Sequence, residues 1–427
     1  MKVAFCTLGC KVNQYESQSM EQALIKRGFE CVGASEEADV YIVNSCTVTA
    51  ESDRKTRQNV RHLRKLHPDA VIVLTGCMPQ AFPEDARLLT QADIVTGNRS
   101  NKQIPDMIDE FFRTRERIVR IAQHENGEKF SGELINDFRE RTRATVKIED
   151  GCNRFCSYCV IPYARGRVRS KPLEDIREEI SSLEKKGFSE IVLVGINLSA
   201  YGTDCGASIC DAVELAASFD GIKRVRLGSL EPDHMTPDVT KRLAECKKLC
   251  PQFHISLQSG CDKTLKRMNR HYTAAEYEEL CTRLRSEFED ATLTTDVMVG
   301  FSGETKEDCE SARDFVRKIG FEKVHVFPYS RRAGTRAAEF PDVVENAEKE
   351  RRSREMIAAA GEVRHEFLER QIGRTVEVLF EEKLRDGTIQ GYTANYTPVR
   401  IKSGCTHGLR KVKITACGDD WCECELI

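Results

Sequence analysis

The sequence predicts an α/β protein with three parts: an N-terminal doubly wound parallel sheet, a central partial (β/α)6 barrel and a small C-terminal β-barrel. Three observations predict this fold class. Apolar strand-like runs alternate with helical stretches near the N-terminus, and the alternation returns as six strand–helix units in the middle of the chain. Short alternating strands between Gly and Asp turns then occupy the C-terminal segment. We therefore expect three regions, at residues 1–115, 138–370 and 371–427.

The first region contains short apolar runs that read as buried strands, each followed by a helical pattern. This alternation favours a parallel sheet, and such sheets bind ligands beyond the carboxyl ends of their strands. The expected strands are Val3–Leu8, Val40–Asn44, Val71–Thr75 and Ile94–Thr96, and the expected helices are Tyr15–Gly28, Glu51–His67, Pro79–Thr90 and Lys102–Arg113.

Three cysteines, Cys10, Cys46 and Cys77, each follow one of these strands. Parallel strands bring their tips to one edge, so we expect the three thiols to converge there. The alternative is three ordinary buried cysteines, since Cys is often buried, but the repeated strand–turn context favours a shared site. Gly9 and Gly76 fit a close backbone approach to a bulky ligand. The pattern predicts an iron–sulfur cluster with one iron that lacks a protein ligand.

The stretch Arg113–Arg143 is charged and weakly periodic, and we interpret it as a linker. After it, six strand–helix units indicate a partial parallel barrel whose site lies at the carboxyl ends of the strands. A long charged helical pattern, Glu345–Arg370, leads out of this region. The expected strands are Ala144–Ile148, Glu190–Gly195, Arg224–Gly228, Phe253–Leu257, Thr294–Val299 and Lys323–Phe327, with helices that include Leu173–Lys186, Asp238–Leu249, Ala274–Phe288 and Thr305–Ile319.

The loop after the first of these strands carries C-x3-C-x2-C, formed by Cys152, Cys156 and Cys159. Three thiolates can hold three irons of a cubane cluster and leave the fourth iron open to chelate a small molecule. Disulfides are disfavoured because nothing marks the chain as secreted. Zinc normally takes a fourth ligand, and no His or Cys follows at finger spacing. The pattern therefore indicates a redox-active cluster in this loop, with a structural metal site as the alternative.

This loop resembles that of the radical S-adenosylmethionine (radical SAM) enzymes. Together with Thr7-Leu-Gly-Cys-Lys-Val-Asn13 and Asn44-Ser-Cys-Thr-Val-Thr49, it makes the whole chain similar to the radical SAM methylthiotransferase family. The resemblance implies two [4Fe-4S] clusters and S-adenosylmethionine (SAM) as cofactors. It implies that the Cys152, Cys156 and Cys159 cluster cleaves SAM and that the Cys10, Cys46 and Cys77 cluster carries sulfur.

The residues around Cys10 resemble the branch that acts on N6-threonylcarbamoyladenosine in tRNA. The isopentenyladenosine branch usually has Gly-Cys-Gln-Met-Asn, and the ribosomal-protein branch has Gly-Cys-Ala-Lys-Asn, where this chain has Gly9-Cys-Lys-Val-Asn13. The resemblance thus implies a transferase that adds a methylthio group to C2 of that nucleoside at position 37. The other two branches are alternatives, and a non-enzymatic metal-containing RNA-binding protein is an alternative of another class.

The resemblance also implies where SAM lies, across the strand ends of the central region. Gly195 and Asn197 would meet its amino acid part, and Tyr158 would offer its backbone to the adenine. Glu231 and Gln258 are candidate contacts to ribose or substrate. The alternative for strand-end residues of this kind is turn chemistry and helix capping.

The last region, residues 371–427, predicts a small barrel of oligonucleotide-binding type and resembles the TRAM domain of tRNA methylthiotransferases. Its aromatic and basic side chains are expected to face RNA, with a solvated barrel face as the alternative. Cys422 and Cys424 are only a weak metal-binding signal. The expected strands are Thr375–Phe380, Thr388–Thr393, Pro398–Lys402 and Arg410–Ala416, and the RNA-facing residues are Tyr392, Tyr396, Arg400, Lys402, Arg410, Lys411 and Lys413.

Composition sets the remaining expectations. The 427 residues carry a net charge of −3 and 19 cysteines, and no apolar run is long enough for a membrane span. Cysteines without a secretion signal predict a reducing cytoplasm. Four runs are basic: Arg54–His67, Arg139–Arg143, Arg165–Lys171 and Arg331–Arg336. Such runs are usually a solvated face, but two of them flank the cluster loop or a strand end, which favours a phosphate-bearing partner. We therefore expect a cytoplasmic monomer that binds tRNA, uses an electron donor of flavodoxin or ferredoxin type, and has no membrane association.

Overall fold

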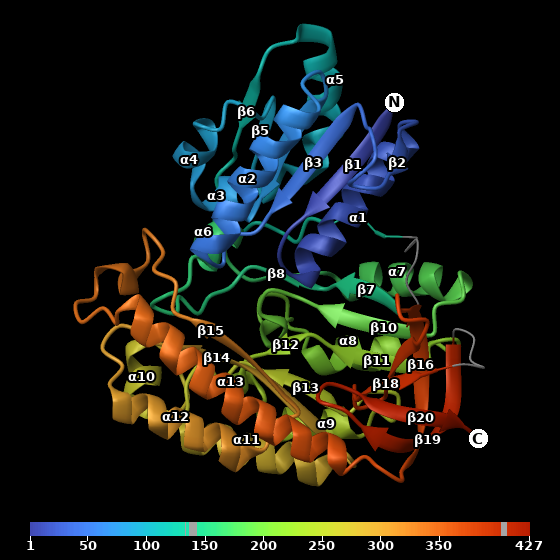
Figure 1. Ribbon diagram of the computed structural model, residues 1–427. Helices are drawn as coiled ribbons and strands as arrows, with labels where there is room; N and C mark the ends of the chain where they lie inside the picture. The colour runs from blue at the N-terminus through green and yellow to red at the C-terminus, as the bar shows by residue number, and fades with distance from the viewer. Residues whose placement is uncertain (133, 136–142, 403–407) are drawn as a thin grey trace.

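The computed structural model describes residues 1–132, 134–135, 143–402 and 408–427. Figure 1 shows three parts: an N-terminal sheet with its helices at the top, a central barrel below it, and a small C-terminal barrel beside the central one. The expected start of the central region, residue 138, lies outside the described residues. None of the described helices has both the length and the apolar character needed to cross a membrane.

The N-terminal sheet has six parallel strands in the order β2-β1-β3-β4-β5-β6. The four expected strands are confirmed, and two short strands add to its edges. The last of these, β6, lies in the stretch that we interpreted as a linker, and that interpretation is wrong there, because a three-residue strand is too short to show periodicity. The strands are β1 Lys2–Thr7, β2 Glu30–Val32, β3 Val40–Ser45, β4 Val71–Gly76, β5 Ile94–Thr96 and β6 Ile118–Arg120.

Helices cover both faces of this sheet, which confirms the doubly wound arrangement. Met20, Leu24 and Met107 pack on one face, and Val60 and Met78 pack on the other. The expected helix Pro79–Thr90 is split in two, because a proline begins the second piece and cannot donate the hydrogen bond that would continue the first. The helices are α1 Lys11–Lys26, α2 Ala50–Leu66, α3 Cys77–Ala81, α4 Pro83–Arg87, η1 Asn98–Gln103 and α5 Ile104–Thr114.

The central barrel has its six expected strands, all parallel, in two sheets of order β11-β10-β7 and β12-β13-β14-β15. β11 and β12 form one strand that is interrupted at Gly228, whose N–H donates to Leu193 O at 2.8 Å. β7 and β15 stand at the two ends, so the barrel is partial. The strands are β7 Arg143–Lys147, β10 Glu190–Val194, β11 Arg224–Leu227, β12 Ser229–Leu230, β13 Gln252–Ile255, β14 Thr292–Val299 and β15 Lys323–Pro328.

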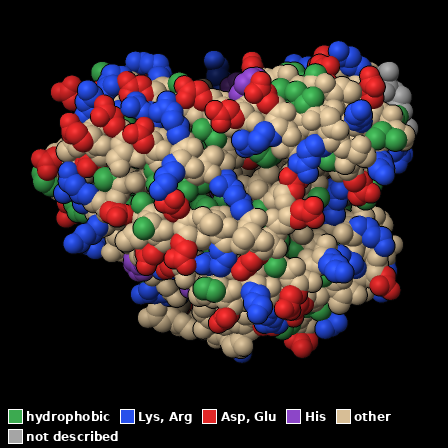
Figure 2. All heavy atoms as spheres, turned by 90° about the horizontal axis from the view of Figure 1, so that it is seen from below, with side chains coloured by type: hydrophobic (Ala, Val, Ile, Leu, Met, Phe, Trp, Pro, Cys, Tyr) green, Lys and Arg blue, Asp and Glu red, His purple; other side chains and the backbone are tan. Residues whose placement is uncertain are grey.

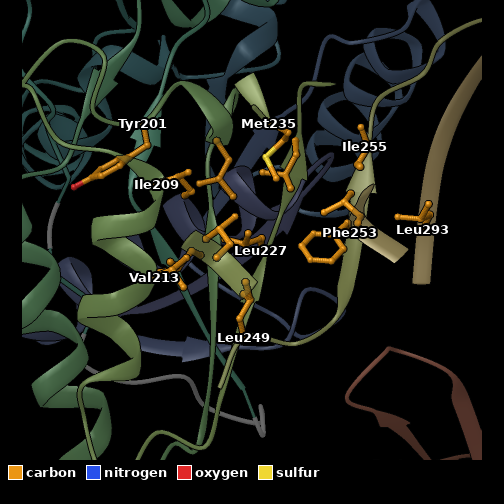
Figure 3. Close-up of a cluster of buried hydrophobic side chains, with 14 of the residues drawn as sticks. Tyr201, Ile209, Val213, Leu227, Met235, Leu249, Phe253, Ile255 and Leu293 are labelled. Carbon is orange, nitrogen blue, oxygen red and sulfur yellow. The ribbon is translucent and has the colours of Figure 1, made fainter. Parts of the chain in front are cut away.

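Helices pack on the outside of these strands, and the core between the two layers is apolar. Val213, Leu227, Phe253 and Leu293 are among the buried side chains that fill it (Figure 3). The helices are α7 Leu173–Lys185, α8 Ile209–Ala217, α9 Pro237–Ala244, α10 Asp262–Arg267, α11 Ala274–Glu287, α12 Lys306–Ile319 and α13 Asn346–Glu369. The loop after β7 carries the short elements β8 Glu149–Asp150, α6 Ile161–Arg165 and β9 Arg169–Ser170.

The C-terminal barrel is closed, in the order β16-β17-β18-β20-β19. β20 was not expected. It places Cys422 and Cys424 in the barrel core beside Val399 and Val412, so these two cysteines are packing residues. The strands are β16 Thr375–Lys383, β17 Ile389–Thr393, β18 Pro398–Ile401, β19 Gly408–Cys417 and β20 Cys422–Leu426.

This barrel packs against the N-terminal ends of the central strands. Arg143, the first residue of β7, donates to Glu381 at 2.9 Å and lies over the rings of Tyr392 and Tyr396. Thr292, the first residue of β14, donates to the Asn395 carbonyl at 2.5 Å. The contacts leave the opposite, carboxyl ends of the central strands free to meet the N-terminal sheet.

Candidate functional site

The C-x3-C-x2-C loop lies between β8 and α6, at the carboxyl end of β7. Gly151 opens it with φ +90°, a conformation that favours glycine, and an added Cβ there would meet the backbone of Arg167. Cys159 N–H donates to Cys156 O at 2.9 Å. Ser157 anchors the loop, because its N–H donates to Met268 O at 2.9 Å.

The three thiols of this loop are close enough to affect one another. Burial, with a smaller contribution from Cys156, raises the pKa of Cys152 to about 12. Burial also raises the pKa of Cys159, and both other thiols add to the rise. Cys156 is buried, and Cys152 and Cys159 are half-buried. Adjacent thiols in such surroundings fit a cluster whose irons neutralise the sulfur charge.

Arg270, which the sequence analysis missed, joins this loop to a predicted site residue. Its Nη1 donates to Cys156 Sγ at 3.2 Å, and its Nη2 pairs with the Glu231 carboxylate. Burial raises the pKa of Glu231, against the opposing effect of Arg270. Only the fold brings Arg270 to the loop, so no local pattern in the sequence could have indicated it.

Asn197 and Gly195 lie next to the first cysteine of the loop. Asn197 Nδ2 is 3.9 Å from Cys152 Sγ, and its N–H donates to Glu149 Oε2 at 2.7 Å. A Cβ at Gly195 would stand 2.5 Å from the same carboxylate oxygen. Within the described residues, Asn197 Oδ1 and Glu149 Oε1 are buried without hydrogen-bond partners. Orphaned acceptors beside a cluster cysteine fit a ligand with an ammonium group, such as the amino acid end of SAM.

Tyr158 and Gln258 occupy the same end of the barrel in different ways. The Tyr158 ring packs edge-on against Phe301, 6.3 Å between centroids, and so points into an apolar cluster. Gln258 has φ +64°, rare for a residue other than glycine, and its N–H donates to Asp296 O at 2.8 Å. Contacts of either residue to SAM stay predictions.

Cys10, Cys46 and Cys77 follow β1, β3 and β4, three neighbouring strands of the N-terminal sheet (Figure 1), and their side chains converge. Asn13 Oδ1 lies 3.9 Å from Cys10 Sγ and 3.9 Å from Cys77 Sγ. A Cβ at Gly9 would stand 2.9 Å from Cys46 Sγ. Burial raises the pKa of Cys77 to about 12, with Cys46 and Cys10 adding to the rise and Arg165 opposing it.

No group of three or more His, Cys, Asp or Glu side chains among the described residues is arranged to hold a single metal ion. That finding is compatible with a cubane, because each cluster cysteine binds a different iron and the three sulfurs need not meet at one point.

Three of the four basic side chains in the run Arg165–Lys171 are buried and cannot face a phosphate in solution, so the prediction is wrong for them, whereas Arg167 is exposed. Arg165 and Lys171 are fully buried and pair with the carboxylates of Glu16 and Glu179. Arg169 is also buried, and its guanidinium lies 3.4 Å from Asp150. Charge runs along the chain do not show which side chains face carboxylates across an interface.

A groove of about 1030 Å³ joins the N-terminal cysteines to the C-terminal barrel. Cys10 and Cys46 line one end, and the inner face of the central barrel, including Gly195, forms its floor. At the other end, Tyr392 and Tyr396 stack with centroids 4.5 Å apart, and Arg400 lies 3.6 Å above the Trp421 ring. Figure 2 shows that acidic and basic side chains alternate over the underside of the molecule, with no single-sign patch there.

The expected RNA-facing residues thus divide into three sets. Tyr392, Tyr396 and Arg400 line the groove. Lys402 lines a separate cavity of about 500 Å³ together with Asp386. The remaining three, Arg410, Lys411 and Lys413, are exposed on β19 and are not among the groove-lining residues.

Comparisons with known proteins follow this division into parts. Residues 2–97 match Uncharacterized protein family UPF0004, and residues 146–316 match the Radical SAM superfamily. The chain is 35% identical, over 94% of its length and 90% of the relative's, to Threonylcarbamoyladenosine tRNA methylthiotransferase MtaB of Bacillus subtilis. It is 36% identical, over 89% of its length and 86% of the relative's, to tRNA-2-methylthio-N(6)-dimethylallyladenosine synthase of Pelotomaculum thermopropionicum.

Two solved structures share the fold at low sequence identity. The radical S-adenosylmethionine methyltransferase TsrM from Kitasatospora setae aligns with a TM-score of 0.56 and 14% identity, over 77% of this chain and 74% of that one. The cobalamin-dependent S-adenosylmethionine radical enzyme OxsB aligns with a TM-score of 0.53 and 12% identity, over 79% of this chain and 54% of that one. The likeness supports the fold alone.

Proposed function

The chain belongs to the radical SAM tRNA methylthiotransferases, and from that premise we propose that it adds a methylthio group to C2 of N6-threonylcarbamoyladenosine at position 37 of tRNA. Membership in this family implies a [4Fe-4S] cluster, SAM and a tRNA substrate. Two further statements are part of our proposal: which nucleoside is modified, and that Cys10, Cys46 and Cys77 hold a second cluster.

The groove is the observation that supports this proposal most. It has Cys10 and Cys46, two of the proposed cluster ligands, at one end and an aromatic, basic surface at the other. Stacked tyrosines and an arginine over an indole ring are surfaces on which unpaired bases stack. A single-stranded loop held there would reach the cysteines with a nucleoside turned out of the stack.

The floor of the groove favours a polar N6 substituent. It includes Gln252, His254, Thr294, Asp296 and His325. A threonylcarbamoyl group offers a carboxylate, a hydroxyl and a urea to such partners, whereas an isopentenyl group would leave polar atoms desolvated and unpaired. The sequence Gly9-Cys-Lys-Val-Asn13 also supports the branch that acts on N6-threonylcarbamoyladenosine.

In the proposed enzyme, Cys152, Cys156 and Cys159 would hold the cluster that binds SAM, and Cys10, Cys46 and Cys77 would hold the second. When bound, these groups supply the radical and sulfur chemistry that an unactivated aromatic C–H requires. The chain's own residues bind and orient: Asn197 and Glu149 would receive the amino acid end of SAM, and Arg270 holds Glu231 against the cysteine loop.

We further propose that the enzyme is a cytoplasmic monomer and that a flavodoxin- or ferredoxin-like protein supplies its electrons. We place its region boundaries near residues 115, 138 and 371. These proposals rest on family resemblance and on the three-part fold.

Nucleoside mass spectrometry tests the substrate. Anaerobically reconstituted protein is incubated with SAM, a reductant and one of two tRNAs, carrying either N6-threonylcarbamoyladenosine or isopentenyladenosine. We expect the methylthio product only from the first. A product only from the second would assign the chain to the isopentenyladenosine branch. No product from either, with methylthiolation of a ribosomal protein instead, would overturn the tRNA assignment.

A further inference from the structure

One side chain reaches from the SAM loop to the other cysteine site. Arg165 is the last residue of α6, the helix that follows Cys159. Its Nε donates to Cys77 Sγ at 3.2 Å, and its Nη2 donates to Asn13 Oδ1 at 2.6 Å. The side chain is fully buried, so these contacts form away from water.

Asn13 extends this contact to the other two cysteines. Its Nδ2 donates to Leu8 O at 2.8 Å and to Ser45 O at 2.9 Å. Leu8 follows β1, two residues before Cys10, and Ser45 is the last residue of β3, directly before Cys46, so one amide group ties together the backbone that leads to both cysteines. Arg165 touches Cys77 directly. Because it also binds the oxygen of the Asn13 amide, it contacts the segments before Cys10 and Cys46 through Asn13.

The charges around Arg165 keep it in place. Its Nη2 lies 3.0 Å from Glu16 Oε2, and its Nη1 lies 3.6 Å from Asp150. Lys147 pairs with the same two carboxylates at 2.8 and 2.7 Å. A guanidinium stays charged under all ordinary conditions, so this buried network presents a permanent positive group to Cys77.

We propose that Arg165 is a positioning residue that couples the two cysteine sites and supports reduction of the cluster on Cys10, Cys46 and Cys77. The proposal rests on the proposed function, because it assumes that these three cysteines hold a cluster. A charged donor at a cluster sulfur favours the reduced state, which carries one more negative charge, and so raises the reduction potential.

A second buried arginine at the same interface provides a matched control. Arg332, in the loop after β15, donates to Thr47 Oγ1 at 2.7 Å and to Asp53 Oδ2 at 2.5 Å. It joins the central barrel to the N-terminal region as Arg165 does, but no described contact links it to a thiol. Substituting it tests loss of a buried interface arginine without loss of a sulfur contact.

The experiment isolates the second cluster in full-length protein. Cys152, Cys156 and Cys159 are changed to Ala, the protein is reconstituted anaerobically, and the remaining cluster is titrated by electron paramagnetic resonance against potential. We expect Arg165→Gln to lower the midpoint potential and alter the spectrum, and Arg165→Lys to restore part of the shift. Arg332→Gln should leave both unchanged.

Each outcome decides the matter. Normal iron content with an unchanged potential in Arg165→Gln would overturn the proposal, as would an equal shift in Arg332→Gln. If Arg165→Gln does not fold, Arg165→Lys tests the contact alone, because it retains the charge but lacks the planar fork that reaches Cys77 Sγ and Asn13 Oδ1 together. We then expect an altered spectrum, and an unchanged spectrum would overturn the coupling of the two sites. Absence of iron from the triple cysteine variant would instead contradict the second cluster itself, and thereby the proposed function.

Discussion

Two glycines show how closely the cysteine sites constrain single residues. Gly9 has φ +101°, and a Cβ on it would stand 2.6 Å from Cys46 Cβ. Gly195 faces the Glu149 carboxylate at similarly short range. At both positions any side chain would occupy the space in which a cysteine or a cofactor contact must lie. Residues that lack a side chain therefore define these sites as much as the thiols do.

Gly9→Ala should disturb the second cluster and leave the first intact. Strain from the positive φ and the contact with Cys46 should cost about 1–3 kcal/mol locally, which we expect to appear as a loss of about half of the bound iron. Gly28→Ala is the matched control, since Gly28 also has a positive φ, +85°, but an added Cβ there meets nothing within 4 Å. Equal iron loss in both variants would contradict the role of Gly9.

The triple change of Cys152, Cys156 and Cys159 to Ala should remove one of two clusters. We expect bound iron to fall from about eight to about four per chain, with SAM cleavage abolished. Iron analysis and an assay for 5′-deoxyadenosine measure the two effects. Equal iron in the parent and the triple variant would show that this loop holds no cluster.

Cys46→Ala should separate reductive SAM cleavage from methylthiolation of tRNA. Because Cys46 lies on the N-terminal sheet and not on the SAM loop, the variant should still cleave SAM reductively. Methylthiolation of tRNA should be lost, since the second cluster would lack a ligand. Product formation at the parent rate would refute a sulfur-carrying role for this cysteine.

At the scale of elements, two strands of the C-terminal barrel present basic residues to different surroundings. Arg400 on β18 lines the groove, while Lys411 on β19 is exposed and does not. Helix α2 presents a third basic surface, formed by Arg54, Arg57, Arg61 and Lys65. Which of these elements contacts phosphate decides how the tRNA lies on the molecule.

Arg400→Ala should weaken tRNA binding and reduce the slope of log affinity against log salt by about 1, because one phosphate contact is lost. Lys411→Ala, on β19, should leave both nearly unchanged. Binding curves at several salt concentrations measure the difference. An effect of Lys411→Ala as large as that of Arg400→Ala would indicate that the β19 face, and not the groove, holds the RNA.

At the scale of the whole molecule, the C-terminal barrel also covers charged residues of the central barrel. Arg226 is 2% exposed, pairs with Glu190 at 3.1 Å and donates to Ala394 O at 3.0 Å. Its guanidinium lies 4.7 Å from the Tyr396 ring centroid. The barrel is therefore a structural partner of the central strands as well as a candidate RNA surface.

Deleting residues 375–427 should have two effects. It should lower the midpoint of thermal unfolding, because it uncovers the Arg226–Glu190 pair and its neighbours. It should also weaken tRNA binding and flatten its salt dependence, while both cysteine triplets remain in the chain. Identical curves of tRNA affinity against salt for full-length and truncated protein would indicate that α2 binds the RNA instead.

Much of this arrangement can be read from the sequence, because it depends on local patterns. Apolar runs and helical periods predicted ten of the parallel strands, and the recurrence of cysteine after strand and turn predicted that Cys10, Cys46 and Cys77 meet. Hydrophobic periodicity is a property of neighbouring residues, and the alternation of strands with helices along the chain predicts parallel pairing. Both can therefore be recognised without knowledge of the fold.

Local sequence patterns could not predict the shortest strands, nor which residues face the core of the C-terminal barrel. The three-residue strands β2 and β6 carry too few positions for a pattern, and they form because a completed sheet offers them an edge. Cys422 and Cys424 gave a weak metal-binding signal in the sequence, and only the pairing of β18 with β20 shows that they lie in the barrel core.

The contacts that surround the two cysteine sites come from far along the chain. Arg270 reaches Cys156, and Arg165 reaches Cys77 and Asn13, across interfaces between regions. The sequence shows that these residues are charged, but only the packed molecule shows that Arg165 is buried against carboxylates and a thiol. A charge buried with its partners and one that faces solvent have the same local sequence, and their energies differ only once the rest of the protein has excluded the water.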